Sequence, residues 1–248
     1  AGHRAGMVLT NMTPGTLRFA VQAIDSAYAG SAFAAEQTFV VPDRLRLVLP
    51  AGATEGDGIF TNAAQVCIRA ALPQATTVTL WSADTSELQV QTSVVLAAGQ
   101  TSETFLSNIM DDAEKDGAQS VAVTAQANGF NPCESRVLIY DNELNALAWD
   151  PIPSPQRRGV AFPARIAAKA VDGETIRNFA GTVNLSGFGV GGAVPIAPAV
   201  SGAFAGGTWT GAVRVLDNRV YVILTAEGPG GTTGDTIPFD VVGPILSV

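Results

Sequence analysis

The stretch TTVTLWSADTSELQVQTSVVLAAGQTSETFLSNI, residues 76–109, shows the pattern that decides the fold. Apolar and polar residues alternate within short segments, and polar or glycine-containing turns separate these segments. Such a period of two is typical of strands that place one face on a core and the other in solvent. In the first segment, alternation turns Val78 and Leu80 inward and places Trp81 outward or at the strand end. The stretch therefore predicts consecutive antiparallel strands.

The same pattern continues in both directions, with strands about ten residues apart, which favours antiparallel β-sandwiches. No amphipathic helix of ten or more residues is apparent, and Asp111–Asp116 is expected to form at most one short turn. We predict an all-β chain of tandem antiparallel sandwiches with no substantial helix. The expected strands are 16–24, 37–41, 44–49, 64–70, 76–82, 93–96, 102–109, 120–127, 134–140, 160–171, 180–186, 207–215, 219–226 and 236–242.

Two breaks divide the chain, one at Val-Pro-Asp (41–43) and one between Asp-Asn-Glu-Leu (141–144) and a proline-rich stretch at 150–155. Two convincing strands before the first break are too few for a stable module, because an isolated hairpin is marginal in water. We therefore expect a fragment of a longer multidomain protein. Its predicted parts are the C-terminal strands of an incomplete module (1–42), one sandwich (43–144), a second sandwich (145–243), and the start of a further module or a linker (244–248).

Composition excludes several classes of function. The 248 residues carry 22 acidic and 14 basic side chains, a net charge of −8, and their only basic cluster is Arg157-Arg158. Nucleic-acid binding needs a larger cationic footprint. Apolar runs are only a few residues long, so we expect no insertion into a membrane. His3 is the only histidine. This leaves no internal histidine for a catalytic triad, and we predict that the chain is not an enzyme.

Three sections of the chain resemble module families of bacterial surface and secreted proteins. Residues 43–143 resemble Calx-beta modules, residues 14–41 resemble the closing strands of a fibronectin type III-like module, and residues 145–243 resemble a bacterial Ig-like module. The matching stretches are ATEGDG (53–58), AGQTSETF (98–105), MDDAEKDG (110–117) and YDNE (140–143) for the first; PGT (14–16) and VQAID (21–25) for the second; and VAFP (160–163), AKA (168–170) and FAGTV (179–183) for the third.

The Calx-beta resemblance implies a calcium site, because acidic residues of calcium-binding members meet at one end of the sandwich. Ca²⁺ prefers six to eight oxygen ligands. This chain departs from the pattern at 141–143, which is Asp-Asn-Glu, and at 118–119, which is Ala-Gln. The alternative interpretation is that these residues form turns by bonding their own backbone. The metal candidates are Glu55, Asp111, Asp112 and Asp141, which Asp57, Asp84, Glu114, Asp116 and Glu143 could join.

Other motifs have structural interpretations. The stretch GFGVGG (187–192) matches a dinucleotide fingerprint, but two prolines follow where a helix would have to start, so we expect a flexible loop. Cys67 is expected to point away from the core, and Cys67 and Cys133 could form a disulfide or remain thiols. Trp81, Trp149 and Trp209 are expected to pack in a core or junction rather than bind sugars.

The functional prediction is a non-catalytic structural, spacer or interaction segment of a large bacterial protein, extracellular or on the cell surface. The alternatives are a calcium-dependent adhesion module and an accessory carbohydrate-binding module of an exported enzyme. Calcium is the one cofactor considered. The expected partners are neighbouring modules or other protein subunits, and cell-surface glycans under the last alternative.

Overall fold

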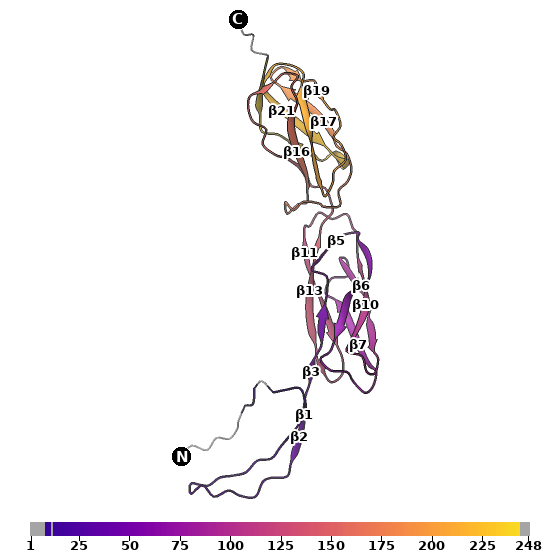
Figure 1. Ribbon diagram of the computed structural model, residues 1–248, viewed down its shortest axis with the longest axis vertical. Coiled ribbons are helices and arrows are strands. Elements are labelled where there is room, and N and C mark those ends of the chain that lie inside the picture. Colours follow the sequence, from indigo (N-terminus) through magenta and orange to yellow (C-terminus); the bar gives the residue numbers. More distant parts are fainter. Residues whose placement is uncertain (1–7, 11, 244–248) are drawn as a thin grey trace.

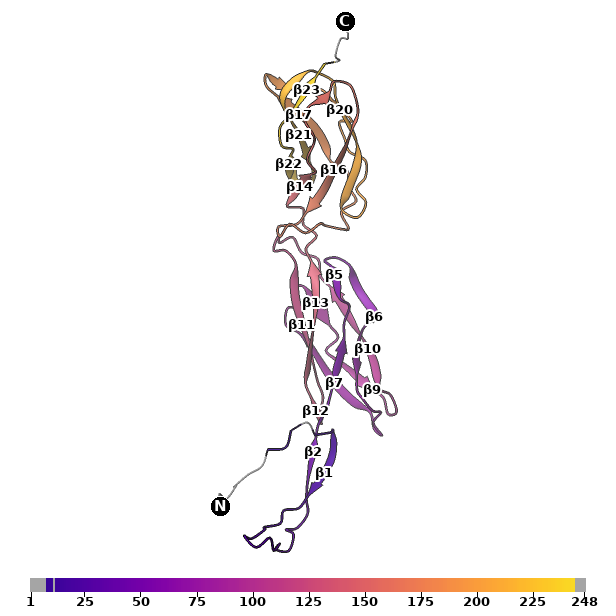
Figure 2. The same ribbon diagram turned by 60° about the vertical axis from the view of Figure 1, so that its left-hand side comes forward.

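A computed structural model describes residues 8–10 and 12–243 of the chain; the predicted start of a further module at 244–248 lies outside them. The chain forms an N-terminal ribbon and two β-sandwich modules that follow one another end to end (Figures 1 and 2). The expected all-β fold is confirmed, and the helical content of the described residues is a single 3₁₀ turn at Pro229–Gly231. No helix in this part of the chain has the length and apolar character needed to cross a membrane.

The N-terminal ribbon consists of β1 (Gly15–Phe19) and β2 (Gln37–Val41), which pair antiparallel. Cross-strand partners place Leu17 opposite Phe39, and the rings of Phe19 and Phe39 meet edge to face at 6.0 Å. One face of the ribbon is therefore apolar, although 45% of Phe19 remains exposed. The strand expected over 16–24 ends at Phe19, because the pairing beyond it is irregular.

The second module, which follows the ribbon and runs from β3 to β13, is a sandwich of two sheets with mostly antiparallel pairing. The strand orders are β4-β6-β10-β8 and β5-β13-β11-β7-β9, with a short parallel pair of β3 and β12 beside them. β5 and β13 also pair in parallel. The bounds are β3 Asp43–Arg44, β4 Arg46–Val48, β5 Gly52–Thr54, β6 Gly58–Cys67, β7 Thr76–Ser82, β8 Leu88–Val90, β9 Ser93–Leu96, β10 Ser102–Ile109, β11 Gln119–Gln126, β12 Phe130–Asn131 and β13 Cys133–Tyr140.

Alternation correctly identified the core of this module. Val78 and Leu80 are buried, while 43% of Trp81 is exposed on the outer face of β7. The expectation of one strand over 44–49 is wrong, because the chain changes partner at Leu45. Residue 44 pairs with β12, whereas residue 46 pairs with β6. Other large side chains of the core are Phe105, Leu88, Leu96, Val123 and Ile139.

The third module, which runs from β14 to β23, is another sandwich with its own core. Its strand orders are β14-β16-β20-β19 and β15-β23-β21-β17-β18, and β22 pairs with β21. Phe162 and Phe239 meet edge to face at 5.8 Å in a core that is separate from the second module's. The bounds are β14 Ala146–Trp149, β15 Gln156–Arg157, β16 Phe162–Lys169, β17 Asn184–Gly189, β18 Gly192–Ala193, β19 Ile196–Ala197, β20 Thr208–Val215, β21 Arg219–Glu227, β22 Thr233–Asp235 and β23 Phe239–Val242.

The glycine-rich stretch 187–192 is part of a hairpin, so the expectation of a flexible loop is wrong. Residues 187–189 belong to β17 and Gly192 to β18; Gly189 pairs with Gly192, and Val190 and Gly191 form the turn between them. A Cβ at Gly187 would lie 2.8 Å from Ile196 Cγ2 and 2.9 Å from the Val194 carbonyl oxygen. Close packing therefore explains this glycine.

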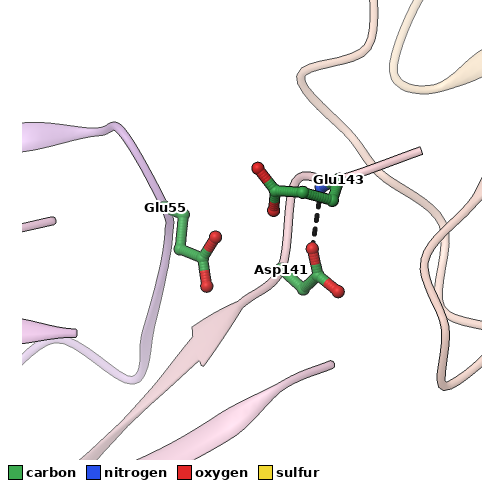
Figure 3. A group of neighbouring side chains, drawn as sticks. All are labelled: Glu55, Asp141 and Glu143. Atoms are coloured by element: carbon green, nitrogen blue, oxygen red, sulfur yellow. Dashed lines mark hydrogen bonds between the residues drawn. The ribbon is translucent and has the colours of Figure 1, made fainter. Parts of the chain in front are cut away.

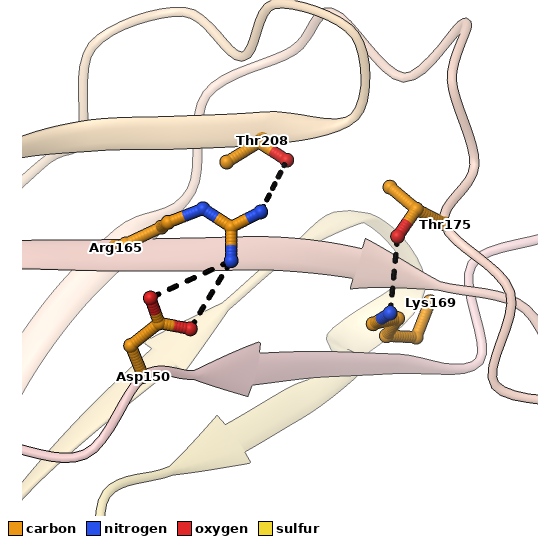
Figure 4. Close-up of polar contacts among 5 residues, drawn as sticks. All are labelled: Asp150, Arg165, Lys169, Thr175 and Thr208. Atoms are coloured by element: carbon orange, nitrogen blue, oxygen red, sulfur yellow. Dashed lines mark hydrogen bonds and ion pairs between the residues drawn. The ribbon is translucent and has the colours of Figure 1, made fainter.

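Polar contacts anchor the proline-rich start of the third module. Arg165 on β16 places Nη1 3.1 Å from Asp150 Oδ1 and Nη2 3.5 Å from Thr208 Oγ1 (Figure 4). Lys169 Nζ donates to Thr175 Oγ1 at 3.0 Å further along the same strand. Arg165 thus connects Asp150, which directly precedes the prolines, to β16, and Lys169 connects β16 to the loop that carries Thr175.

The second and third modules contact each other directly. Lys115 Nζ donates at 2.7 Å to the carbonyl oxygen of Leu144, whose side chain packs against the third module's core, and the backbone N–H of Ala118 donates to Asp172 Oδ2 at 3.0 Å. The Arg177 guanidinium carbon lies 6.0 Å from the centroid of the Tyr140 ring. The contacts involve the loop after β10 and the end of β13, on the side where the acidic residues gather.

Candidate metal centre at the end of the second module

The acidic residues meet at the end of the second module that faces the third. Glu55 follows β5, whereas Asp141 and Glu143 follow β13 (Figure 3). Because β5 and β13 pair in parallel, with Thr54 opposite Tyr140, the residues after both strands emerge side by side. The topology thus brings together carboxylates that are more than eighty residues apart in sequence.

Glu55 is the centre of two carboxylate groups. One oxygen each from Glu55, Asp141 and Glu143 lie within 4.8 Å of one another. The same holds for Glu55, Glu87 and Asp116. Such spacing allows a single ion to contact all three members of either group.

These carboxylates are buried with few partners. Only 2% of Glu55 is exposed, and neither of its carboxylate oxygens has a hydrogen-bond partner among the described residues. One oxygen of Glu87 and one of Glu143 are also buried without a partner there. None of the ion pairs in the described part of the chain involves these acids. A buried charge without a partner is costly, so the arrangement calls for either protons or a cation.

The pKa values reflect this environment. Burial, followed by the neighbouring Glu143 carboxyl and the charges of Glu87 and Asp141, raises the pKa of Glu55 to about 9. Burial, followed by the adjacent Asp141 carboxyl, raises the pKa of Glu143 to about 7. The pKa of Glu87 is raised chiefly by burial. Without a cation, Glu55 therefore keeps its proton at neutral pH.

Backbone and amide donors hold the surrounding chain. Asp141 accepts the Gly117 N–H through Oδ2 at 3.0 Å and the Glu143 N–H through Oδ1 at 2.7 Å. Asn142 Nδ2 donates to the Glu55 carbonyl oxygen at 2.9 Å and to Asp111 Oδ1 at 2.7 Å. The centre is thus tied to the loop after β10, to β13 and to the turn after β5.

The structure brings some of the predicted metal candidates together and leaves the others outside both carboxylate groups. It brings Glu55 and Asp141 together, along with Glu143 and Asp116, which could join them. Asp111 lies beside the centre but pairs with Asn142. The other candidates act as turn formers or lie outside both groups: Asp112 Oδ1 accepts the Glu114 N–H, Asp57 Oδ2 accepts the Thr54 N–H, Asp84 Oδ1 accepts the Ser86 N–H, and Glu114 is exposed.

Glu87 is a member of the acidic cluster that the sequence pattern did not predict. It directly precedes the inward-facing Leu88 at the start of β8, where alternation would turn a charged side chain to solvent. Instead Glu87 is buried, and its carbonyl oxygen accepts the Met110 N–H at 2.9 Å. The one sequence signal was Asp84, three positions before Glu87, a turn-forming residue whose side chain accepts the Ser86 N–H.

Both cysteines are free thiols, so the structure holds no Cys67–Cys133 disulfide. Trp209 is buried in the third core, and Trp149 Nε1 donates to the Gly234 carbonyl oxygen at 2.9 Å. Trp149 and Trp209 are therefore engaged in packing, as expected, whereas Trp81 is 43% exposed on the outer face of β7, so the expected packing is wrong for it.

Comparisons with known proteins find similarity in fold only. No family model matches the chain, and no curated protein matches it. The solved structures it resembles include domains 4 and 5 of the S-layer protein SbsC (TM-score 0.43, 14% identity, covering 81% of this chain and 98% of that one). They also include CBD12 from CALX1.2 (TM-score 0.41, 13% identity, covering 75% of this chain and 83% of that one). The D00-D0 domain of Intimin is a third (TM-score 0.35, 13% identity, covering 80% of this chain and 99% of that one).

Proposed function

We propose that this chain is a non-catalytic structural segment of an exported bacterial protein, and that its second module binds Ca²⁺ at the end facing the third. The observation that carries the calcium proposal is the buried Glu55 carboxylate, which has no hydrogen-bond partner in the described chain and belongs to two carboxylate groups. A divalent cation would neutralise charges that otherwise have to be protonated.

The donor set favours a hard cation. The members of both groups are all carboxylates, with no cysteine or histidine among them. Oxygen-only sites suit Ca²⁺ or Mg²⁺, while zinc sites use nitrogen and sulfur ligands more often. Mg²⁺ demands near-ideal octahedral geometry, whereas Ca²⁺ accepts irregular sets of ligands from several loops. The acids here come from four different loops, which favours Ca²⁺.

The spacer role is supported by the arrangement of the modules. Each sandwich has its own core, and direct hydrogen bonds join the two at the junction. The apolar face of the ribbon, with Leu17, Phe19 and Phe39, offers a surface for a neighbouring module or another subunit. An extracellular or cell-surface location would supply the millimolar Ca²⁺ that weak sites need.

Calcium titration of the intact chain tests the proposal, by calorimetry and by the shift in melting temperature. We expect heat of binding and a raised Tm at millimolar Ca²⁺, because a ligand that binds the folded state stabilises it. Glu55→Gln should abolish both effects while preserving the fold. Glu134→Gln changes an exposed glutamate at the far end of β13 and serves as the control. Absence of heat and of a melting shift in the wild type would refute the calcium site.

A further inference from the structure

Three arginines converge at the other end of the second module. Arg44 and Arg46 alternate with the buried Leu45, so both point to the outer face. Arg46 pairs across the sheet with Cys67 on β6, and Arg69 follows two residues later. Together with Asp43 and Cys67, these arginines line a groove of about 420 Å³. We call it the arginine groove.

The arginine groove is remote from the metal centre. β6 begins at Gly58, next to the turn that carries Glu55, and ends at Cys67 in the groove. Its ten residues, at about 3.3 Å each, place the two ends about 30 Å apart. The groove and the two carboxylate groups therefore lie at opposite ends of the module.

The three guanidinium groups lack acidic partners in the described chain. The ion pairs of the described residues use other arginines. Asp43 Oδ1 accepts the backbone N–H of Arg44 at 2.7 Å, and Arg46 Nη2 makes only a long contact of 3.9 Å with Cys67 Sγ. Seven of the eleven described arginines have no ion pair, so what distinguishes Arg44, Arg46 and Arg69 is that they line one groove. Three positive charges along one groove favour a bound anion.

Protection of a sheet edge is the simplest alternative explanation, because charged side chains on edge strands block the addition of further strands. It accounts for Arg46, since β4 is the edge strand of its sheet. It does not account for Arg69, which follows β6, an inner strand, and yet lines the same groove. The shared groove, rather than the edge, is what the three arginines have in common.

The geometry points to the arginine groove as a binding site for a multiply charged oxyanion, a phosphate or sulfate group. Guanidinium groups form forked hydrogen bonds to such oxygens. A tetrahedral dianion offers enough acceptors for three guanidiniums, whereas a single carboxylate offers two oxygens. The groove volume falls within the range of about 300 to 1,000 Å³ that is usual for ligand pockets. The group is carried either by a free ion or by an anionic polymer such as a sulfated polysaccharide.

Titration of the intact chain with sodium sulfate, at constant ionic strength and in EDTA, tests the site by calorimetry. A second arm uses dextran sulfate, with uncharged dextran as its control. We expect Arg44→Gln, Arg46→Gln and Arg69→Gln each to weaken binding about two- to fivefold, and the triple variant more than about tenfold. Arg136→Gln, which removes an exposed, ion-paired arginine of the same module, should bind like the wild type.

The two arms identify the source of the anion. Binding of both probes supports a site that a free ion fills, and binding of dextran sulfate alone supports a polymer-borne group. Failure of both probes to bind at millimolar concentration overturns the proposal. So does equal binding by the wild type and the triple variant, or an equal loss in Arg136→Gln, which would mean general charge attraction. Unchanged melting temperatures establish that the variants are folded. Glu55→Gln should leave sulfate binding unaffected, which keeps this test independent of the calcium site.

Discussion

The Asp172 side chain of the third module accepts the backbone N–H of Ala118 in the second at 3.0 Å. Its other oxygen accepts the Glu174 N–H at 2.9 Å, which fixes the hairpin that carries it. The approach is close, because a Cβ on Gly117 would lie 3.2 Å from Asp172 Cβ. This contact joins the two modules beside the candidate metal centre.

We expect Asp172→Ala to loosen the junction while both modules stay folded. Removal of the acceptor leaves the Ala118 N–H without its partner across the junction. Small-angle scattering should show a broader distribution of interatomic distances. Hydrogen bonds from Ala118 and Glu174 lower the pKa of Asp172. The stability from this contact is therefore present above pH 4 and lost as the pH falls further. Asp217→Asn, at a distant exposed ion pair, is the control, and unchanged scattering from Asp172→Ala would contradict the prediction.

Without divalent cations, the second module should become less stable as the pH rises. The pKa of Glu55 is about 9 in the folded chain and 4.5 in the unfolded chain, so the folded state holds an extra proton between these values. Its stabilising effect is complete below pH 4.5 and is lost as the pH rises toward 9. Thermal melts in EDTA at pH 5, 7 and 9 measure the slope. Glu55→Gln should reduce the slope, while Glu143 and Glu87, whose pKa values are also raised, maintain the rest; an equal slope in both proteins would count against the assignment.

Phe105→Ala should destabilise the second module by about 3 to 5 kcal/mol, the usual cost of emptying an aromatic core position. Phe105 is 1% exposed, whereas its neighbour Leu106 is 48% exposed. Leu106→Ala is therefore a matched control that should cost less than about 1 kcal/mol. Urea unfolding followed by hydrogen exchange separates the two modules. The third module should keep its stability, because its core is separate, and a loss there would contradict this independence.

Gly187→Ala should destabilise the third module by about 1 to 3 kcal/mol, the cost of overpacking. The added methyl group would meet Ile196 Cγ2 at 2.8 Å and the Val194 carbonyl oxygen at 2.9 Å. Gly181→Ala is the control, because its methyl group would make an ordinary contact with Phe179 Cζ at 3.7 Å. Denaturant unfolding of both variants measures the difference, and equal stabilities would show that the hairpin is not packed as described.

Both cysteines should be available for alkylation in the folded chain, with Cys133 the slower of the two. Burial raises the pKa of the Cys133 thiol and so reduces its thiolate fraction. Cys133 also packs against the second core, whereas Cys67 opens into the arginine groove. Mass spectrometry of peptides after timed labelling at pH 8 checks the order. Recovery of a Cys67–Cys133 linked peptide would contradict the free thiols.

Local patterns predicted much of the fold. The strands 37–41, 76–82, 93–96 and 102–109 were predicted with the bounds that the structure shows. Each is a segment whose inward and outward residues alternate, so the information lies within the segment itself. The prediction failed at 44–49, where the strand changes partner at Leu45. Nothing within that segment records which distant strand lies beside it.

By itself, the sequence determined that this is an all-β chain of tandem modules, and its resemblance to Calx-beta modules predicted that Glu55 and Asp141 lie at one acidic end. Only the tertiary structure decided which residues make up the candidate metal centre and the arginine groove. It buried Glu87 beside Glu55, used Asp112 for a turn, and gathered Arg44, Arg46 and Arg69 although they form no cluster in the sequence. The reason is physical. Period-two alternation acts between sequence neighbours, whereas a site depends on the register and pairing of strands that lie far apart in the chain.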